Sequence, residues 1–172
     1  MRQIGCDFRV EVSRAEEESA GLEPQALVVR NALAKAGEVA RRNAGAVVVG
    51  ADTVVACGER IFGKPADAQE AKEMLASLAG RAHEVYTGIA LYTGGRSYSD
   101  VARTTVHMAA LTKAEIEAYA AMEEPLDKAG AYGIQGRAAL FVTSIEGSYS
   151  NVVGLPLHAL YALAKKAGVE LV

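Results

Sequence analysis

Hydrophobic and polar residues follow one another along the chain in patterns that predict strands and helices in mixed order. Apolar and polar residues alternate from Phe8 to Val12, which predicts a strand. A short continuous apolar run at 46–50 is typical of a strand covered on both faces. Residues 84–107 predict two strands joined at Gly94-Gly95, and Leu140–Ile145 predicts a further strand.

Helix starts are indicated by residues that satisfy free backbone groups at a helix end. Pro24 suits a first turn, and an alanine-rich stretch follows it. The stretches 67–70 and 112–115 each have the spacing of a capping box. The expected helices run from Pro24 to about Asn43, from Asp67 to near Gly80, from Thr112 through Met122, and from Pro156 to about Lys166.

The order of these elements predicts an α/β fold, with a mixed central sheet flanked by helices and a cleft at the strand ends. The chain has 172 residues, 51% of them hydrophobic and 23% charged, which suffices for a core and argues against disorder. The sequence contains no repeat, linker or low-complexity tract. We therefore expect one domain over residues 1–172.

Charge and cysteine content narrow the function classes. Lys and Arg number 18 against 21 Asp and Glu, and no basic block is present, so binding to nucleic acid is not expected. Cys6 and Cys57 are isolated, and the chain has neither a secretory segment nor an apolar run long enough for a membrane span. These features predict a cytoplasmic protein without a membrane partner. A small anionic ligand remains compatible with the composition.

Two short motifs contain candidates for phosphate chemistry. Residues 58–64 fit the first seven positions of a phosphate-binding P-loop, but Pro65 replaces the hydroxyl residue that would bind magnesium, so the P-loop interpretation fails. Lys64 is either a phosphate-binding cation or a solvated loop lysine. Asp52 follows the apolar run at 46–50, where a carboxylate is either functional or the cap of a turn.

Two glycine-rich segments carry polar side chains at high density. The stretch 127–136 includes Lys128 and Gln135, and an amide such as Gln135 can both donate to and accept from a base edge. The stretch 147–156 ends at a predicted helix start, which favours anions. The three histidines have no metal-binding spacing and are expected to be surface or core residues.

Taken together, these segments resemble the Maf family, the septum-formation-protein-like nucleoside triphosphate pyrophosphatases. The resemblance covers nearly the whole chain and is most specific in the two glycine-rich segments. It implies a fold similar to the Maf and inosine triphosphate pyrophosphatases. The form with Lys128, Tyr132 and Gln135 is similar to the branch that acts on dTTP and UTP, whereas the 7-methyl-GTP branch has cysteine and glutamate in place of Lys128 and Gln135. The motif residues are Glu16-Glu17, Lys35-Ala36, Gly50-Ala51-Asp52-Thr53, Gly63-Lys64-Pro65, Thr87-Gly88, Asp127–Gly136 and Gly147–Pro156.

The resemblance implies hydrolysis of a nucleoside triphosphate to the monophosphate and pyrophosphate, with Asp52 as the general base or a metal ligand. Mg²⁺ or Mn²⁺ is the implied cofactor, with Glu16 and Glu17 as further carboxylate ligands. Lys35, Lys64 and Lys128 would bind the substrate, and Thr53 and Gln135 would help to select a pyrimidine. The resemblance is also consistent with a homodimer and with a role in septum formation. The residues to which the resemblance assigns these roles are Asp52, Glu16, Glu17, Lys35, Lys64, Lys128, Thr53 and Gln135.

The start of the chain departs from the family pattern, which begins with a strand and the sequence S-x-S-P-R-R. A strand, a loop and two helical turns correspond to roughly 15–20 residues upstream of Met1. We expect a chain extended by such a segment to be more stable and more active. The main alternative function is a non-catalytic nucleotide-binding or cell-division regulatory protein. Pyrophosphate release from dTTP or UTP distinguishes the two functions.

Overall fold

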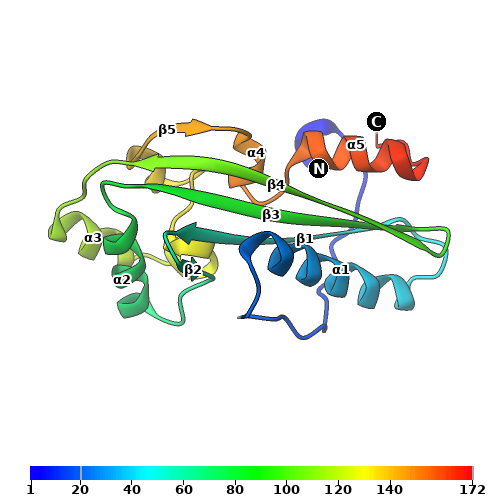
Figure 1. The fold of residues 1–172 in the computed structure, drawn as a ribbon, viewed down its shortest axis with the longest axis horizontal. Helices are drawn as coiled ribbons and strands as arrows, with labels where there is room; N and C mark the ends of the chain where they lie inside the picture. The colour runs from blue at the N-terminus through cyan, green and yellow to red at the C-terminus, as the bar shows by residue number, and fades with distance from the viewer. Residues whose placement is uncertain (20, 172) are drawn as a thin grey trace. The chain divides into compact units, whose positions relative to one another are not determined.

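The computed structural model describes residues 1–19 and 21–171. Within these residues, five strands form a sheet in the order β2-β1-β3-β4-β5 (Figure 1). This confirms the predicted α/β class. The strands are β1 (Val48–Cys57), β2 (Arg60–Phe62), β3 (Ala82–Thr93), β4 (Arg96–Met108) and β5 (Val142–Glu146).

Strand register is set by tight turns and short ladders. Gly94 and Gly95 join β3 to β4 with φ of 54° and 76°, and two consecutive positive φ angles are what a two-residue hairpin turn requires. The predicted hairpin is confirmed. β1 pairs antiparallel with β2, with Val55 opposite Phe62. β4 pairs antiparallel with β5, and their register shifts between His107 and Met108.

The predicted helices are confirmed with small changes at their ends. Thr112 accepts a hydrogen bond from the Glu115 amide while the Glu115 carboxylate accepts from the Thr112 amide, a complete capping box. Asp67 likewise accepts from the Glu70 amide at 2.8 Å. The α-helices are α1 (Pro24–Arg42), α2 (Ala68–Leu78), α3 (Lys113–Ala120), α4 (Tyr149–Val152) and α5 (Leu157–Ala167). The 3₁₀ turns are η1 (Arg2–Ile4), η2 (Glu124–Asp127), η3 (Ala129–Ala131) and η4 (Arg137–Leu140).

The chain divides into two compact units, and we describe each by itself. Their boundaries fall inside β1, β3 and β4, so these strands contribute residues to both. The first unit comprises Met1–Asp52, Thr87–Ala102 and Gly154–Val172. The second unit comprises Thr53–Tyr86 and Arg103–Val153.

In the first unit, α1 and α5 cover opposite faces of the strands (Figure 1). Ile89 and Leu91 of β3 pack against Leu160 and Leu163 of α5. Ala90, which lies between them in sequence, packs instead against the alanines of α1. This division follows from the alternation of side chains along a strand. The first unit is therefore a helix–sheet–helix sandwich.

Two glycines allow α1 to approach the sheet closely. A Cβ atom at Gly88 would lie 2.3 Å from the carbonyl oxygen of Val28, and one at Gly50 would lie 2.8 Å from that of Ala32. Neither position has room for a side chain without movement of the helix backbone. The close approach of α1 explains why the motifs at 50–53 and 87–88 have glycine at positions 50 and 88.

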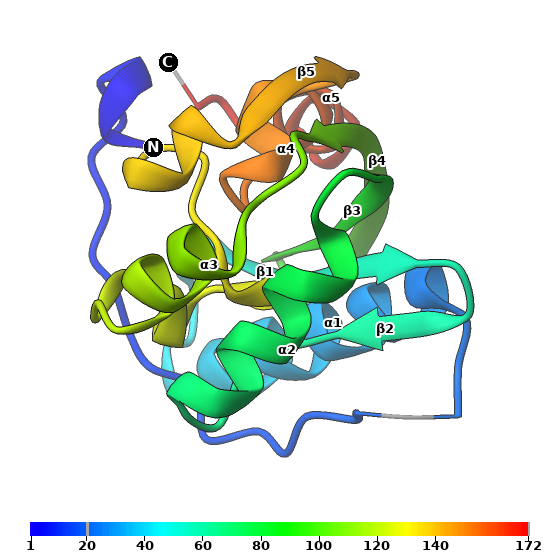
Figure 2. The ribbon, with the colours of Figure 1, turned by 90° about the vertical axis from the view of Figure 1, so that its left-hand side faces the viewer.

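The second unit has its own apolar core. Leu75 and Leu78 of α2 and Tyr119 of α3 pack with Val85 of β3 and Val106 of β4. Figure 2 shows α2 and α3 side by side in the foreground. The short turns η2 and η3 pack against α2. The glycine-rich stretch 127–136 is thereby attached to this core.

Three sequence expectations about strands were wrong. Phe8–Val12 is not a strand: Val10 and Val12 are 79% and 84% exposed, and the Val12 carbonyl accepts from the Arg42 side chain of α1 instead of from a strand. β1 continues to Cys57, so Asp52 lies within the strand and not at its carboxyl end. The last strand was expected to begin at Leu140, but β5 begins at Val142. Leu140 is instead the last residue of the turn η4, and its side chain is 84% exposed. Among the described residues, no helix has the length and apolar character needed to span a bilayer.

Candidate functional site

Asp52 is the centre of a polar cluster in the first unit. Its side chain is 9% exposed and lies on β1. The Lys35 ammonium donates to Oδ1 at 2.7 Å, and the Asn31 amide donates to Oδ2 at 3.0 Å. Each carboxylate oxygen therefore has a donor, as a buried charge requires. These contacts fix the carboxylate in one orientation.

Helix α1 supplies both donors from the same face. Asn31 and Lys35 are four residues apart, which places them one turn from each other along the helix. Asn31 is 4% exposed, and it also accepts from the Glu18 amide at 2.9 Å and donates to the Glu18 carbonyl at 3.0 Å. Asn31 thus connects the acidic stretch 16–18 to Asp52. Sequence reasoning missed this residue, although its spacing from Lys35 on a largely apolar helix is a signal.

Lys35 lies between two carboxylates. Its ammonium is 2.7 Å from Asp52 and 2.9 Å from Glu17. Burial works against the charged ammonium, but the hydrogen bonds to Asp52 and Glu17 outweigh it and raise the pKa of Lys35 above 10.5. Lys35 is therefore positively charged throughout the physiological pH range. Its charge balances that of Asp52.

The carboxylates of this cluster suit a hard cation. Asp52 and Glu17 both lie within hydrogen-bonding distance of one positive nitrogen, and carboxylate oxygens are the ligands that Mg²⁺ and Mn²⁺ prefer. Glu16 is exposed and lies outside the contacts that join Glu17 to Lys35. Within the described ranges, no group of three or more acidic, histidine or cysteine residues forms a complete metal site. Asp52 and Glu17 supply carboxylate oxygens of the right chemistry, and the Lys35 ammonium lies between them in this structure.

The other predicted site residues belong to the second unit. Thr53 follows Asp52 in β1 and is half-buried, whereas Lys64 and Gln135 are exposed. Lys128 donates a short hydrogen bond to Asp127. That hydrogen bond is the main cause of the lowered pKa of Asp127, and the charge of Lys64 contributes to it. The two lysines therefore share one acidic neighbour.

The stretch 127–136 is held to the second unit by specific hydrogen bonds. The Gly130 amide donates to the Gly63 carbonyl at 3.0 Å, which joins this stretch to the loop of Lys64. The Tyr132 hydroxyl lies 2.7 Å from Nε2 of His83. A Cβ atom at Gly130 would lie 2.9 Å from the Val55 side chain. Gly130 also has φ of 70°, so both the close packing and the left-handed backbone favour glycine at this position.

The second glycine-rich segment has a structural role in the second unit. Asn151 is fully buried, and its amide donates to the Val85 carbonyl at 3.0 Å and to the Thr104 hydroxyl at 2.9 Å. These contacts join the segment to β3 and β4. The Ser148 side chain caps the short helix α4 by accepting a hydrogen bond from the backbone N–H of Asn151. Ser148 and Asn151 therefore form hydrogen bonds that stabilise the fold.

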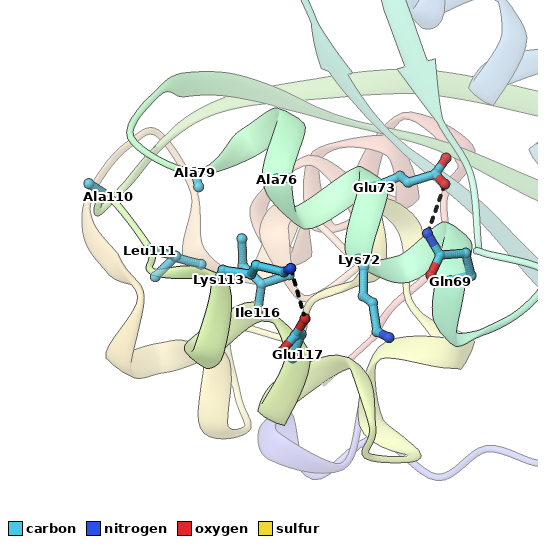
Figure 3. Close-up of a pocket in the computed structure, with 10 residues that line it drawn as sticks. All are labelled: Gln69, Lys72, Glu73, Ala76, Ala79, Ala110, Leu111, Lys113, Ile116 and Glu117. Atoms are coloured by element: carbon cyan, nitrogen blue, oxygen red, sulfur yellow. Dashed lines mark hydrogen bonds and ion pairs between the residues drawn. The ribbon is translucent and has the colours of Figure 1, made fainter.

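Each unit carries a surface pocket. In the first unit, a groove of about 550 Å³ is lined by Lys35, by residues 46–51 at and just before the start of β1, and by the segment 6–11. In the second unit, α2 and α3 border a separate pocket of about 680 Å³ (Figure 3). Its rim includes the Lys113–Glu117 ion pair and the Gln69–Glu73 hydrogen bond. No predicted site residue lines this second pocket.

Comparisons with known proteins identify the family of the chain. The profile of the Maf family, described as "Maf-like protein", matches residues 1–167. A protein of Symbiobacterium thermophilum named dTTP/UTP pyrophosphatase is 46% identical over 169 residues, which are 98% of this chain and 87% of that protein. Proteins of the same name from Bacillus cereus AH820 and Bacillus anthracis are each 46% identical over 167 residues, 96% of this chain and 87% of each relative. The chain belongs to the Maf family.

Proposed function

We propose that this protein is a nucleoside triphosphate pyrophosphatase that hydrolyses dTTP and UTP to the monophosphate and pyrophosphate. The observation that carries the proposal is the buried Asp52 carboxylate, held by Lys35 and Asn31, in a Maf-family chain. The names of relatives that are 46% identical over nearly the whole chain support the choice of substrate.

Asp52 would act as the general base. Water attacks the α-phosphorus, its proton passes to an oxygen of Asp52, and the bond from the α-phosphorus to the bridging oxygen breaks to release pyrophosphate. A positioned base commonly contributes about a hundredfold to ten-thousandfold in rate. The donors Lys35 and Asn31 keep the carboxylate oriented toward one position. The Lys35 ammonium, with Lys64 and Lys128, would offset the negative charge of the polyphosphate.

Mg²⁺ or Mn²⁺ is the proposed cofactor. Asp52 and Glu17 are the residues that would hold it, and Glu16 is a third carboxylate in the same acidic stretch. When bound, such an ion neutralises phosphate charge and favours departure of pyrophosphate. The chain's own contribution is an oriented carboxylate beside a permanent positive charge.

Base selection would rest on Thr53 and Gln135. The side chain of Gln135 is exposed, so its amide is accessible to a base. An amide can both donate and accept, which suits the adjacent carbonyl and N–H groups of thymine and uracil. Lys128 lies seven residues earlier in the same stretch and would bind phosphate.

The proposal extends to a single domain that acts in the cytoplasm, forms a homodimer and contributes to septum formation. The single domain and the cytoplasmic location are supported by the composition and the absence of linkers, and the homodimer and septum formation by the family resemblance. Light scattering of the purified protein tests the dimer directly: twice the mass of the 18.0 kDa chain is expected, and the mass of one chain refutes it.

A nucleotide panel tests the function. The protein is incubated with dTTP, UTP, dCTP, dATP and dGTP, with Mg²⁺ and with Mn²⁺, and pyrophosphate release is measured. Rapid release from dTTP and UTP is expected. A thermal shift with dTTP in the absence of any product would favour the alternative of a non-catalytic nucleotide-binding or division-regulatory protein. Equal release from all five nucleotides would refute pyrimidine selection.

A further inference from the structure

A polar pair lies within the apolar core of the second unit. His83 of β3 is 2% exposed, and Tyr132 is 5% exposed. His83 Nε2 is 2.7 Å from the Tyr132 hydroxyl, and the rings meet edge to face with centroids 5.4 Å apart. His83 Nδ1 has no hydrogen-bond partner among the described residues. Among the described residues, only one of the two ring nitrogens of His83 therefore has a hydrogen-bond partner.

Such a pair does not favour stability by itself. Burial lowers the pKa of His83 to about 4, so the ring is neutral at physiological pH and adds no ion pair. A buried polar atom without a partner destabilises a fold, and two apolar side chains of similar shape serve a core equally well. The one contact that distinguishes His83 from an apolar residue is its hydrogen bond to Tyr132. Through this hydrogen bond, His83 holds the stretch 127–136, which contains Tyr132.

This stretch has a backbone that needs external anchors. Gly130 and Ala131 have φ of 70° and 61°, and a positive φ is unfavourable for alanine by about 1 kcal/mol. Consecutive residues of this kind persist only where their surroundings fix them. Gly130 is fixed by the Gly63 carbonyl, and the Gly133 amide donates to the Tyr119 hydroxyl at 3.2 Å. Tyr132, between these two points, is fixed by His83.

A second anchor closes the far end of the stretch. The Tyr119 hydroxyl donates to the Glu124 carboxylate at 2.8 Å, and that carboxylate accepts from the Arg137 amide at 3.1 Å. Lys128 and Gln135 lie on either side of Tyr132, four and three residues away. The anchor at Tyr132 therefore lies within the segment of backbone that carries both side chains.

We propose that His83 is a positioning residue that, through the Tyr132 hydroxyl, fixes the stretch 127–136 and thereby sets nucleotide affinity and the preference for pyrimidines. His83 acts through Tyr132 and does not touch the substrate. The identity of the ligand rests on the proposed function.

Tyr132→Phe tests the inference by removing one oxygen atom from the core. The probe is binding of α,β-methylene-dTTP and of α,β-methylene-dGTP, measured by calorimetry. Loss of one hydrogen bond predicts that Kd for the thymidine analogue rises about threefold to tenfold. The preference over the guanosine analogue should narrow by a similar factor. For hydrolysis of dTTP, KM should rise while kcat changes by less than about threefold, because Asp52 is not part of the anchored stretch.

His83→Gln and His83→Leu form the matched pair. The glutamine amide can still bond to the Tyr132 hydroxyl, so His83→Gln should stay within about twofold of the wild-type Kd, whereas His83→Leu should behave as Tyr132→Phe does. Val106→Ala is the control for stability alone, because Val106 is a fully buried residue of the same core without a polar side chain. It should lower the melting temperature without changing nucleotide preference.

The inference is overturned if Tyr132→Phe keeps the wild-type Kd and preference, or if its effects match those of Val106→Ala. Amide hydrogen exchange separates this failure from failure of the proposed function. In the protein without nucleotide, Tyr132→Phe should speed exchange within 127–136 but not in α5. If the wild-type protein binds neither analogue, the proposed function fails and the selectivity role with it. Unchanged exchange would refute the anchoring itself.

Discussion

Protonation of His83 should make the stability of the protein fall in a defined pH window. Burial, with a smaller contribution from the charge of His107, lowers the pKa of His83 from 6.5 to about 4 in the folded protein. In the unfolded chain the ring returns to its ordinary pKa. Between pH 6.5 and 4 the unfolded chain therefore binds a proton that the folded chain does not. Linkage then requires the free energy of unfolding to fall as the pH falls through this window.

The size of the effect follows from the separation of the two pKa values. Each unit of separation corresponds to about 1.4 kcal/mol, so His83 alone should reduce the free energy of unfolding by about 3 kcal/mol between pH 8 and pH 4. For a chain of this size, that loss lowers the melting temperature by roughly 6–12 °C.

The assay compares the wild-type protein with His83→Gln. Urea unfolding is followed by circular dichroism from pH 8 to pH 4, and the difference in unfolding free energy is plotted against pH. Carboxylates common to both proteins cancel in this difference, and glutamine does not titrate. The wild-type protein should lose about 3 kcal/mol relative to the variant. A difference that is constant across the range, or an NMR titration of His83 with a midpoint near 6.5, would refute the reasoning.

Three further substitutions test separate parts of the structure. Gly88→Ala should destabilise the protein by about 3 kcal/mol or more in urea unfolding, because its Cβ would lie 2.3 Å from the Val28 carbonyl oxygen; a loss below about 1 kcal/mol would contradict the close approach of α1. Thr112→Ala should cost about 1 kcal/mol in the same measurement by removing the capping box of α3, and an unchanged midpoint would contradict this. Gln135→Ala should narrow the gap in kcat/KM between dTTP and dGTP by about tenfold, whereas an equal fall for both nucleotides would make Gln135 a structural residue.

Much of the fold could be predicted from the sequence because its signals are local. Two glycines at 94–95 between alternating strands specify a hairpin, and Thr112 with Glu115 specifies a helix start. The alternation at Phe8–Val12 was equally local but misleading. Those residues interact with side chains of α1, and alternation alone does not show whether a strand partner is present.

The candidate site was predictable only in part, because its contacts connect distant segments. The sequence resemblance supplied Asp52, Lys35 and Glu17, and the structure joins these three by hydrogen bonds and ion pairs. Asn31 could not be assigned, because its importance depends on reaching both Glu18 and Asp52. The roles of Thr53, Lys64, Lys128 and Gln135 remain predictions.

His83 illustrates the same limit. In the sequence it is one of three scattered histidines and was expected to be a surface or core residue. The structure confirms burial in the core, and it adds a partner 49 positions away in Tyr132. Neither hydrophobic periodicity nor motif spacing contains that pairing. It arises because β3 and the stretch 127–136 pack in the same unit.

The role of Asp52 is tested most directly by following dTTP hydrolysis with ³¹P NMR in wild type and Asp52→Asn. The wild-type protein should yield dTMP and pyrophosphate, and Asp52→Asn should be slower by about a hundredfold to ten-thousandfold while still binding α,β-methylene-dTTP. Asn31→Ala controls for the lost hydrogen bond, since it removes the donor to Oδ2 but keeps the Asp52 carboxylate; it should retain far more activity than Asp52→Asn. Near-wild-type turnover by Asp52→Asn, or products dTDP and orthophosphate from the wild-type protein, would contradict the proposed mechanism.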